Sequence, residues 1–357
     1  MTGNKGEWSE FYTFIKLLAD KKIVAADAEL RKNDSLYFPI LSILRNENNS
    51  LNEYKIANDE QVNISSSGTH ISVFDARGLN EKATSIFNAI KSGSKTFEIP
   101  AANQLMAALH VTNLKAGNNR KEDITLKIHD LNTQTEQTAG FSIKSMLGSP
   151  ATLLNASGAT NFQYKLVGCT DDLMSVINSI DTRSKIRDRV LHIKGAGISF
   201  EFQKVNSAIF ADNLRIIEST LPLILSEYVL SYYSNNGAVL SDLSESVLNE
   251  SSLLQQLGLS EVAYTHKIKT FLHAIALGMV PASRWDGEVR AHGGYIVVRE
   301  DGEIVCYHVF NADQFREYLF KNVKFDSPSA TRHKYGLIYK ELDEYYINLN
   351  IQVRFIK

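Results

Sequence analysis

The stretch KEDITLKIHD (residues 121–130), followed after a polar segment by GFSIKS (residues 140–145), decides the fold of this chain. Apolar and polar residues alternate over residues 124–129, and such alternation is typical of a β-strand with one buried face. GFSIKS begins a second strand pattern, and the polar residues between the two patterns predict a turn. The stretch therefore predicts a β-hairpin within a larger sheet.

The hairpin brings an acidic and a basic side chain together. Folding it about the middle of its turn places Asp123 within a residue or two of Lys144 on the neighbouring strand. Cleavage of phosphodiesters with a divalent metal needs such a pair, because the carboxylate binds Mg²⁺ while the lysine stabilises charge or positions the attacking water. A solvated cross-strand ion pair of small energetic value is the alternative. The spacing leaves both interpretations open.

Helix and strand patterns alternate on either side of the hairpin. Helices are predicted over residues 7–18, 81–93, 101–110, 170–192, 210–235 and much of 240–280. Strands are predicted over residues 161–168, 198–205, 293–310 and 345–356, the third of these as a hairpin with Asp301-Gly302 at its turn. This order predicts an α/β fold in which helices flank a mixed β-sheet. We expect one enlarged domain over residues 1–357 with a helical insertion at about 206–280.

Composition bounds the class of protein. The chain has 357 residues, with 38 Lys and Arg against 40 Asp and Glu, and a formal net charge of −2. This excludes a disordered or collagen-like chain and argues against a polyanion-binding protein of the histone kind, but it allows positive charge gathered on one face. Two cysteines, Cys169 and Cys306, favour a reducing compartment. Because no signal region or membrane span is recognised, we expect a cytoplasmic protein that does not contact a membrane.

The first helix carries a further acidic candidate. Glu7 lies near the middle of the apolar face of this helix, in line with Phe11 and Phe14. A buried carboxylate is costly unless it is paired or binds a metal, so Glu7 is a candidate metal ligand. Capping of the first helical turn is the alternative role. Glu10, at the edge of the apolar stripe, is the substitute candidate.

Three blocks of the sequence resemble the HpaII restriction endonuclease family. They are GNKGEWSE (residues 3–10), GFSIKSMLGSPATLLNASGATNFQY (140–164) and SPSATRHKYGLIYKELDEYYINLNIQVRF (327–355), so the resemblance spans most of the chain. More widely, an Asp followed about twenty residues later by a strand with x-x-Lys resembles the PD-(D/E)xK nuclease core. We therefore expect a restriction-endonuclease-like core with helical additions.

The resemblance implies a type II restriction endonuclease that uses Mg²⁺ to cut double-stranded DNA at a short palindrome. The target of the family's namesake is CCGG. A palindrome read by identical subunits implies a two-fold homodimer in which each active site cuts one strand. A cognate DNA methyltransferase would be a genetic rather than a physical partner, because the host DNA must be protected.

The family's catalytic residues carry over onto the hairpin. Asp123 matches the metal-binding Asp, and Lys144 matches the catalytic Lys. Ser142 stands in the catalytic site where the wider superfamily has Asp or Glu, which leaves the second metal-binding carboxylate open. Some nucleases of this fold take it from another element. Glu7 is the first choice, with Glu10 behind it.

A rival placement uses residues 201–204, where Glu201 and Lys204 lie on another predicted strand. The segment before that strand is predicted to be a helix and a turn rather than a hairpin strand with an Asp. The order strand, hairpin, strand therefore favours the first placement.

Two segments have residue types suited to DNA. Bases are read by donors and acceptors on Arg, Lys, Asn and Gln, and phosphates are bound by basic clusters. The polar segment after the catalytic strand offers Asn155, Ser157, Thr160, Asn161 and Gln163. A basic cluster near the C-terminus offers Arg332, His333 and Lys334. Ordinary surface loops are the alternative for both.

Three functions remain open at this point. The first is a type II restriction endonuclease, and the second is a structure-specific or nicking nuclease of the same fold. The third is a non-catalytic module that binds DNA or protein, which the absence of an acid at Ser142 keeps open.

Overall fold

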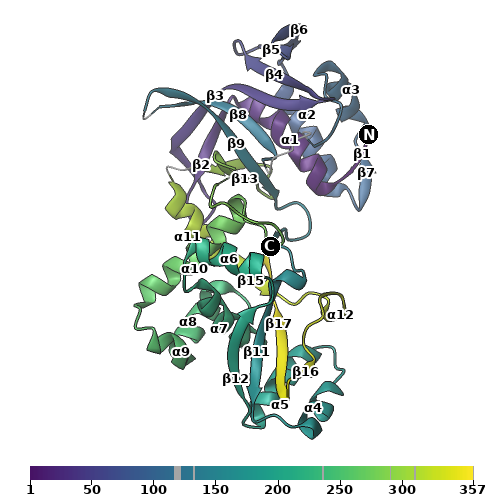
Figure 1. Ribbon diagram of the computed structural model, residues 1–357. Helices are drawn as coiled ribbons and strands as arrows, with labels where there is room; N and C mark the ends of the chain where they lie inside the picture. The colour runs from purple at the N-terminus through teal and green to yellow at the C-terminus, as the bar shows by residue number, and fades with distance from the viewer. Residues whose placement is uncertain (116–121, 132, 235–236, 290, 309–310, 357) are drawn as a thin grey trace. The chain divides into compact units, whose positions relative to one another are not determined.

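A computed structural model describes residues 1–115, 122–131, 133–234, 237–289, 291–308 and 311–356 (Figure 1). The chain packs as two compact units, one made of Met1–Ala151 and Val289–Tyr318, the other of Thr152–Glu288 and Leu319–Lys357. Helices and strands occur in both, so the predicted mixed α/β class is confirmed. The single enlarged domain stays a prediction, because units that are compact need not fold separately.

The first unit is built on a nine-stranded sheet in the order β2-β14-β13-β9-β8-β3-β4-β5-β6. The long strand β3 pairs with β2 through its first half and with β8 through its second, so six of these strands close a ring. Strand β13 runs parallel to β9, and β14 runs parallel to β2, while the other pairs are antiparallel. The mixed sheet is thus confirmed, and its closure is a feature that the sequence did not predict. The strands are β2 (Lys22–Ala26), β3 (Lys32–Glu47), β4 (Ser50–Ile56), β5 (Gln61–Ser66), β6 (Thr69–Asp75), β8 (Ile124–Asp130), β9 (Thr135–Ser145), β13 (Gly294–Val298) and β14 (Ile304–Tyr307).

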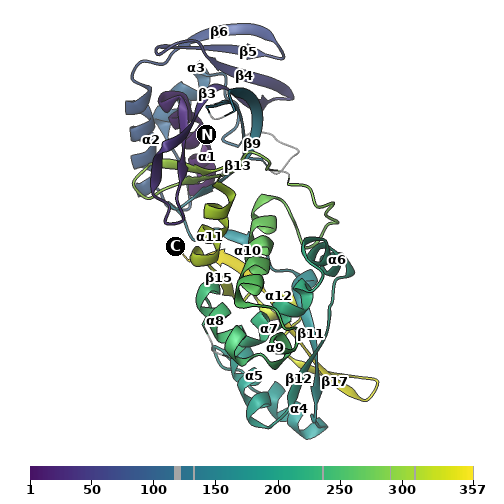
Figure 2. The same ribbon diagram turned by 90° about the vertical axis from the view of Figure 1, so that its left-hand side faces the viewer.

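Helix α1 (Lys5–Asp20) forms the centre of the first unit's core. Its aromatic residues Trp8, Phe11 and Phe14 are fully buried, and Phe14 packs edge-on against Tyr54 of β4 with ring centroids 4.8 Å apart. The helix contacts β2, β3 and β9 and lies beside α2 (Leu79–Ser92), as Figures 1 and 2 show. The predicted first helix is therefore confirmed.

Two further elements complete this part of the unit. Helix α3 (Pro100–Ala108) begins with the proline that the sequence places at its entry, where a missing N–H costs nothing. Strands β1 (Thr2–Asn4) and β7 (Thr96–Glu98) form a separate antiparallel pair at the start of α1.

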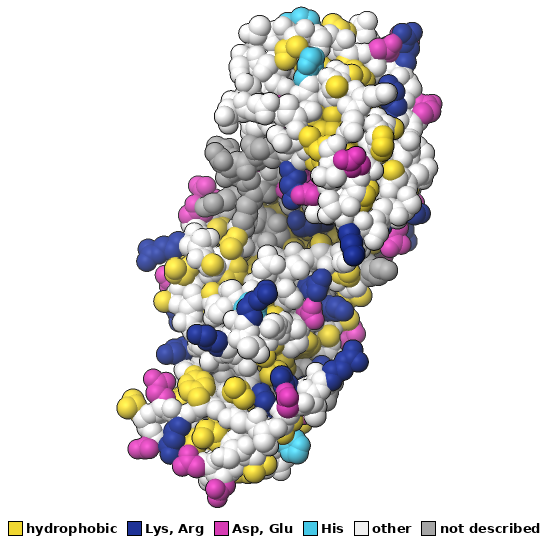
Figure 3. Space-filling model, turned by 90° about the vertical axis from the view of Figure 1, so that its right-hand side faces the viewer, with side chains coloured by type: hydrophobic (Ala, Val, Ile, Leu, Met, Phe, Trp, Pro, Cys, Tyr) yellow, Lys and Arg dark blue, Asp and Glu magenta, His cyan; other side chains and the backbone are white. Residues whose placement is uncertain are grey.

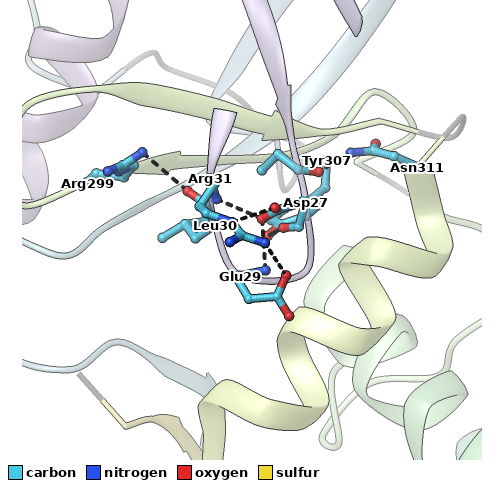
Figure 4. A network of polar contacts seen from close by, with 8 residues as sticks. Asp27, Glu29, Leu30, Arg31, Arg299, Tyr307 and Asn311 are labelled. Atoms are coloured by element: carbon cyan, nitrogen blue, oxygen red, sulfur yellow. Dashed lines mark hydrogen bonds and ion pairs between the residues drawn. The ribbon is translucent and has the colours of Figure 1, made fainter. Parts of the chain in front are cut away.

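The turn between β2 and β3 is held by a network of polar contacts (Figure 4). The carboxylate of Asp27 accepts hydrogen bonds from the backbone N–H groups of Glu29 and Arg31 and from the Arg31 guanidinium. Tyr307 at the end of β14 donates to the carbonyl of Asp27 at 2.7 Å, and Asn311 donates to that of Ala26 at 3.0 Å. These contacts fix the turn onto the hairpin β13–β14, whose Asp-Gly turn is confirmed.

The second unit contains a four-stranded sheet, β12-β11-β17-β16, and a three-stranded sheet, β10-β18-β15. Their strands are β10 (Thr152–Leu154), β11 (Asn161–Val167), β12 (Ser199–Val205), β15 (Val323–Asp326), β16 (Ile338–Glu341), β17 (Glu344–Asn350) and β18 (Gln352–Phe355). The single strand predicted over 345–356 is thus two strands in different sheets. Alternation could not reveal the break, because Ile351 between them is itself fully buried.

The helices of the second unit are shorter than the sequence predicts. Those expected over 170–192 and 210–235 are each divided in two. The helices are α4 (Asp171–Asn178), α5 (Lys185–Gly195), α6 (Ala208–Ile217), α7 (Leu221–Tyr233), α8 (Leu240–Glu250), α9 (Ser252–Gln256), α10 (Glu261–Leu277) and α12 (Ala330–His333), with a 3₁₀ turn η1 (Gly158–Thr160). Five of them, α6 to α10, fill the segment predicted as a helical insertion. The boundary between the units falls within α11 (Ala312–Asn322). No helix within the described residues is long and apolar enough to cross a membrane.

Candidate active site

The hairpin β8–β9 has the predicted register. Ile124 pairs with Phe141, and the N–H of Asp123 donates to the Phe141 carbonyl at 2.8 Å. Asp123 therefore precedes β8 directly opposite Ser142, with Lys144 two residues farther along β9. Strand β9 begins earlier than expected, at Thr135, because the threonines of the polar segment extend the pairing along exposed strand instead of forming a longer turn.

The Asp123 carboxylate is held by β9. Its Oδ2 accepts hydrogen bonds from the Ile143 N–H at 2.7 Å and from the Ser142 hydroxyl at 3.2 Å. Ser142 is 7% exposed, and β13 pairs with the other edge of β9, placing Val297 beside Lys144. A strand paired on both sides gives the three site residues a rigid support.

Helix α1 contributes Glu10 to the same cluster of charges. A hydrogen bond of 2.8 Å between the hydroxyls of Ser9 and Ser145 joins this helix to the end of β9. The Glu10 side chain is 16% exposed, and burial, followed by the charge of Asp123, raises its pKa from 4.5 to about 7. Lys115 and Lys144 act in the opposite direction, and Lys115 Nζ lies 3.8 Å from a Glu10 oxygen. Glu10 is therefore the carboxylate of α1 that is coupled to Asp123.

The structure gives Glu7 the capping geometry. Its N–H donates to Asn4 Oδ1 at 3.1 Å, and its carboxylate accepts from the Asn4 N–H at 2.9 Å, which together form a capping box. The apolar stripe of the sequence suggested that Glu7 is a buried metal ligand. Hydrophobic spacing does not take account of the free N–H groups of the first helical turn, which a carboxylate can cap. Asn4 followed three residues later by Glu7 was the sequence signal that could have identified the cap.

A buried ion pair in β3 holds the segment that ends at Lys115. Arg45 and Glu47 of β3 are 2% and 3% exposed, and Arg45 Nε lies 2.9 Å from the Glu47 carboxylate. Glu47 also accepts from the N–H and the hydroxyl of Thr112, while Arg45 donates to the Asn113 carbonyl. The pair thereby fixes the segment that ends at Lys115. Nothing in the local sequence indicated these contacts between β3 and that segment.

The donor set suits a hard divalent cation. Asp123 and Glu10 supply carboxylate oxygens, and the effect of Asp123 on the Glu10 pKa indicates a repulsion that a cation would relieve. Within the described residues, no group of three or more His, Cys, Asp or Glu side chains is arranged to hold a metal. Magnesium fits such a sparse set, because it keeps several waters and takes further oxygens from a bound phosphate.

A pocket of about 480 Å³ opens at this place, and we call it the active-site pocket. Its lining includes Glu10 and Lys144 and two more lysines, Lys5 and Lys95. The lining residues are Asn4, Lys5, Gly6, Glu10, Lys95, Ile143, Lys144, Ser145, Gly148, Ser149 and Ala151. All belong to the first unit.

The polar segment expected to face DNA lies largely inside the second unit. Thr160, Asn161 and Gln163 are 0%, 4% and 7% exposed, and Gln163 donates to the Tyr339 hydroxyl at 2.6 Å. In this structure these three side chains hold the segment rather than face solvent. Ser157 is half-buried and caps η1, and Asn155 is exposed. Polarity alone could not distinguish buried hydrogen-bonding partners from a surface.

The structure joins the two segments predicted to bind DNA. Asn161 Nδ2 donates to the His333 carbonyl at 3.0 Å across 172 residues of sequence. Asn350 supports this contact, since it is fully buried and donates to Asn161 Oδ1. Arg332 and Lys334 are exposed beside the half-buried His333. The face drawn in Figure 3 shows lysine and arginine side chains interspersed with acidic ones.

The rival placement lacks an opposing acid. Glu201 and Lys204 are exposed on β12, an edge strand of the four-stranded sheet, where Glu201 stands opposite Lys165 and Lys204 opposite Gln163. The geometry therefore favours the hairpin β8–β9.

Comparisons with known proteins agree over nearly the whole chain. The family described as HpaII restriction endonuclease matches residues 4–355. A protein of Haemophilus parainfluenzae named type II restriction enzyme HpaII is 42% identical over an alignment of 357 positions that covers 99% of this chain and 99% of the relative. No solved structure gives a significant match.

Proposed function

The chain belongs to the HpaII restriction endonuclease family and is a type II restriction enzyme, a site-specific deoxyribonuclease, and on this premise we propose that Asp123, Glu10 and Lys144 form its catalytic site. We further propose Mg²⁺ as the cofactor, CCGG in double-stranded DNA as the target and a two-fold homodimer as the active form. A cognate DNA methyltransferase is the expected genetic partner. Membership of this family favours the first of the three functions considered from the sequence.

One observation carries the assignment of the site. The strand that bears Lys144 also holds the Asp123 carboxylate, through the Ile143 N–H and the Ser142 hydroxyl, and α1 places Glu10 within electrostatic reach of both charges. This arrangement is consistent with a PD-(D/E)xK core in which Glu10 takes the role of the acid absent at Ser142. We therefore propose Glu10 as the second metal-binding residue, in place of Glu7.

Each residue then has a distinct task. Asp123 and Glu10 would hold the metal, which when bound places positive charge against the scissile phosphate. Ser142 orients Asp123 by donating to Oδ2, so that the other oxygen is left for the metal. Lys144 places its ammonium against the phosphate, where it stabilises the charge that develops as water attacks phosphorus and the P–O bond breaks.

The second unit is proposed to contribute to recognition. Arg332 and Lys334 are exposed cations, and an arginine can bond both acceptors of a guanine in the major groove. The partly buried hydrogen bond from Asn161 to the His333 carbonyl holds the backbone between them. Of the polar segment, exposed Asn155 is the candidate for direct contact, while Ser157, Thr160, Asn161 and Gln163 position it.

Plasmid digestion tests the proposed function. Incubation with Mg²⁺ is expected to give discrete fragments whose sequenced ends lie within CCGG, and EDTA is expected to prevent cleavage. Smeared products or nicks without a common sequence would contradict site-specific cleavage at this palindrome. Discrete ends at another sequence would contradict the proposed target but not the enzyme class.

A further inference from the structure

The active-site pocket extends beyond the proposed catalytic residues. Its lining residues include three lysines, Lys5, Lys95 and Lys144, against a single carboxylate, Glu10. Lys5 lies at the start of α1, one helical turn and more before Glu10, and Lys95 lies in the turn between α2 and β7. The pocket therefore offers positive charge in addition to that of Lys144, and it suits an anion larger than one phosphate.

The strand pair β1–β7 places these two lysines together. Asn4 pairs with Thr96, so Lys5, which follows Asn4, and Lys95, which precedes Thr96, stand beside the same end of the pair. Lys95 has a φ of 56°, a left-handed conformation that residues other than glycine rarely adopt. Strained backbone of this kind persists only where the surrounding structure imposes it, and it is often found at ligand sites.

A contact with the end of α2 holds the Lys5 side chain, and the turn after α2 carries Lys95. Lys5 Nζ donates to the Lys91 carbonyl at 2.9 Å. An ammonium has three N–H donors, so two remain for a ligand. At Gly93 any Cβ would overlap the ring of Phe97, so the turn that leads to Lys95 is closely packed. The Lys5 ammonium is thus held by a hydrogen bond, and the exposed Lys95 side chain is carried by a closely packed backbone turn.

We propose that Lys5 and Lys95 bind a backbone phosphate of the DNA strand that is being cut, adjacent to the scissile phosphate, and thereby position the latter against Lys144. Successive phosphates of one strand are joined through a single sugar, so a strand whose scissile phosphate reaches Lys144 carries its next phosphate along the same pocket. Lys5 and Lys95 are positioning residues in this arrangement, because they do not touch the reacting atoms. The inference rests on the proposed function of the pocket.

A purely structural role for Lys5 is the competing explanation. A lysine that bonds a carbonyl at the end of a helix can stabilise that helix without binding any ligand. The two roles differ in what they change. Loss of the structural contact lowers the melting temperature, whereas loss of a phosphate contact reduces the salt dependence of DNA binding.

The test combines lysine variants with modified DNA. Lys5→Gln, Lys95→Gln and, as a matched control, Lys91→Gln are compared for binding to a CCGG duplex in Ca²⁺ over a range of salt concentrations. Each pocket variant is expected to reduce the magnitude of the slope of log K against log salt, by at most about 0.9, the value for one complete phosphate contact. The control, an exposed lysine outside the pocket lining, is expected to keep the wild-type slope.

Methylphosphonate substitution identifies the phosphate. Removing the charge of single phosphates around the cut should weaken wild-type binding at one flanking position. The same substitution should weaken binding less in Lys5→Gln and in Lys95→Gln than in the wild type. A wild-type slope and wild-type methylphosphonate sensitivity in both variants would overturn the inference, as would a lowered melting temperature without any change of slope. The proposed function fails by a separate result, which is undiminished cleavage by Lys144→Ala.

Discussion

The backbone N–H of Ile143 donates to Oδ2 of Asp123 at 2.7 Å, across the two strands of the hairpin. This bond fixes the carboxylate that precedes β8 onto the strand that carries Lys144. The acid and the lysine are therefore positioned by one element, and neither depends on a flexible loop for its place. The proposed chemistry follows from that shared support.

The Ser142 hydroxyl should contribute to catalysis by orienting Asp123. Ser142→Ala removes the 3.2 Å hydrogen bond and keeps the bond from Ile143. A bond to a charged group is worth about 1.5–3 kcal/mol, so single-turnover cleavage is expected to slow by roughly tenfold or more. An unchanged single-turnover rate at saturating Mg²⁺ would show that Oδ2 needs no second donor.

The two glutamates of α1 should respond differently to the same substitution. Glu10→Gln is expected to raise the Mg²⁺ concentration needed for cleavage severalfold or to abolish cleavage, since it removes a proposed metal ligand. Glu7→Gln is the matched control, because a glutamine can still accept the Asn4 N–H in the capping box. A Mg²⁺ titration of cleavage distinguishes the two. The assignment reverses if Glu7→Gln alone changes the metal requirement.

The raised pKa of Glu10 predicts how the stability of the metal-free protein depends on pH. Because burial and Asp123 raise this pKa from 4.5 to about 7, the folded state binds a proton more tightly than the unfolded state. The stability that proton binding by Glu10 adds to the folded state is complete below about pH 4.5 and is lost as pH rises to about 7. As pH rises through this window, the melting temperature of the wild type in EDTA should therefore fall relative to that of Glu10→Gln. Parallel profiles for the two proteins would contradict the raised pKa.

The hydrogen bond from Asn161 to His333 should support DNA binding indirectly. Asn161→Ala leaves the His333 carbonyl and the buried Asn350 without this partner, at a cost of about 1–3 kcal/mol in the free energy of unfolding. Arg332→Ala changes an exposed side chain and should leave the melting temperature unchanged. Both variants should weaken binding to CCGG in Ca²⁺. Wild-type affinity in Arg332→Ala would remove that residue from the proposed recognition surface.

The sequence predicted the hairpin and its register because alternation and turn polarity are local signals. Asp123, Ser142 and Lys144 lie on paired strands, so counting residues from the turn was enough to place them. Glu10 could not be chosen over Glu7 in the same way. The choice depends on the cap formed by Asn4 and on the packing of α1 against β9, which a helical wheel does not contain.

The remaining differences also come from contacts between distant segments. The closure of six strands through β3 depends on a strand long enough to pair with two partners at once. The burial of Asn161 depends on Asn350, 189 residues away. Lys5 and Lys95 are separated by about half of the first unit's sequence and are brought together by the pairing of β1 with β7. Patterns within single elements carry no information on such contacts.

The measurement that tests the central claim most directly is single-turnover cleavage of a CCGG duplex by Lys144→Ala, with binding in Ca²⁺ measured on the same preparation. Lys127→Ala, on the same hairpin and in an exposed ion pair with Glu136, is the matched control. The account predicts that Lys144→Ala binds the duplex with nearly wild-type affinity and does not cleave it. Lys127→Ala is predicted to bind and to cleave the duplex. Wild-type cleavage by Lys144→Ala would show that the catalytic site lies elsewhere.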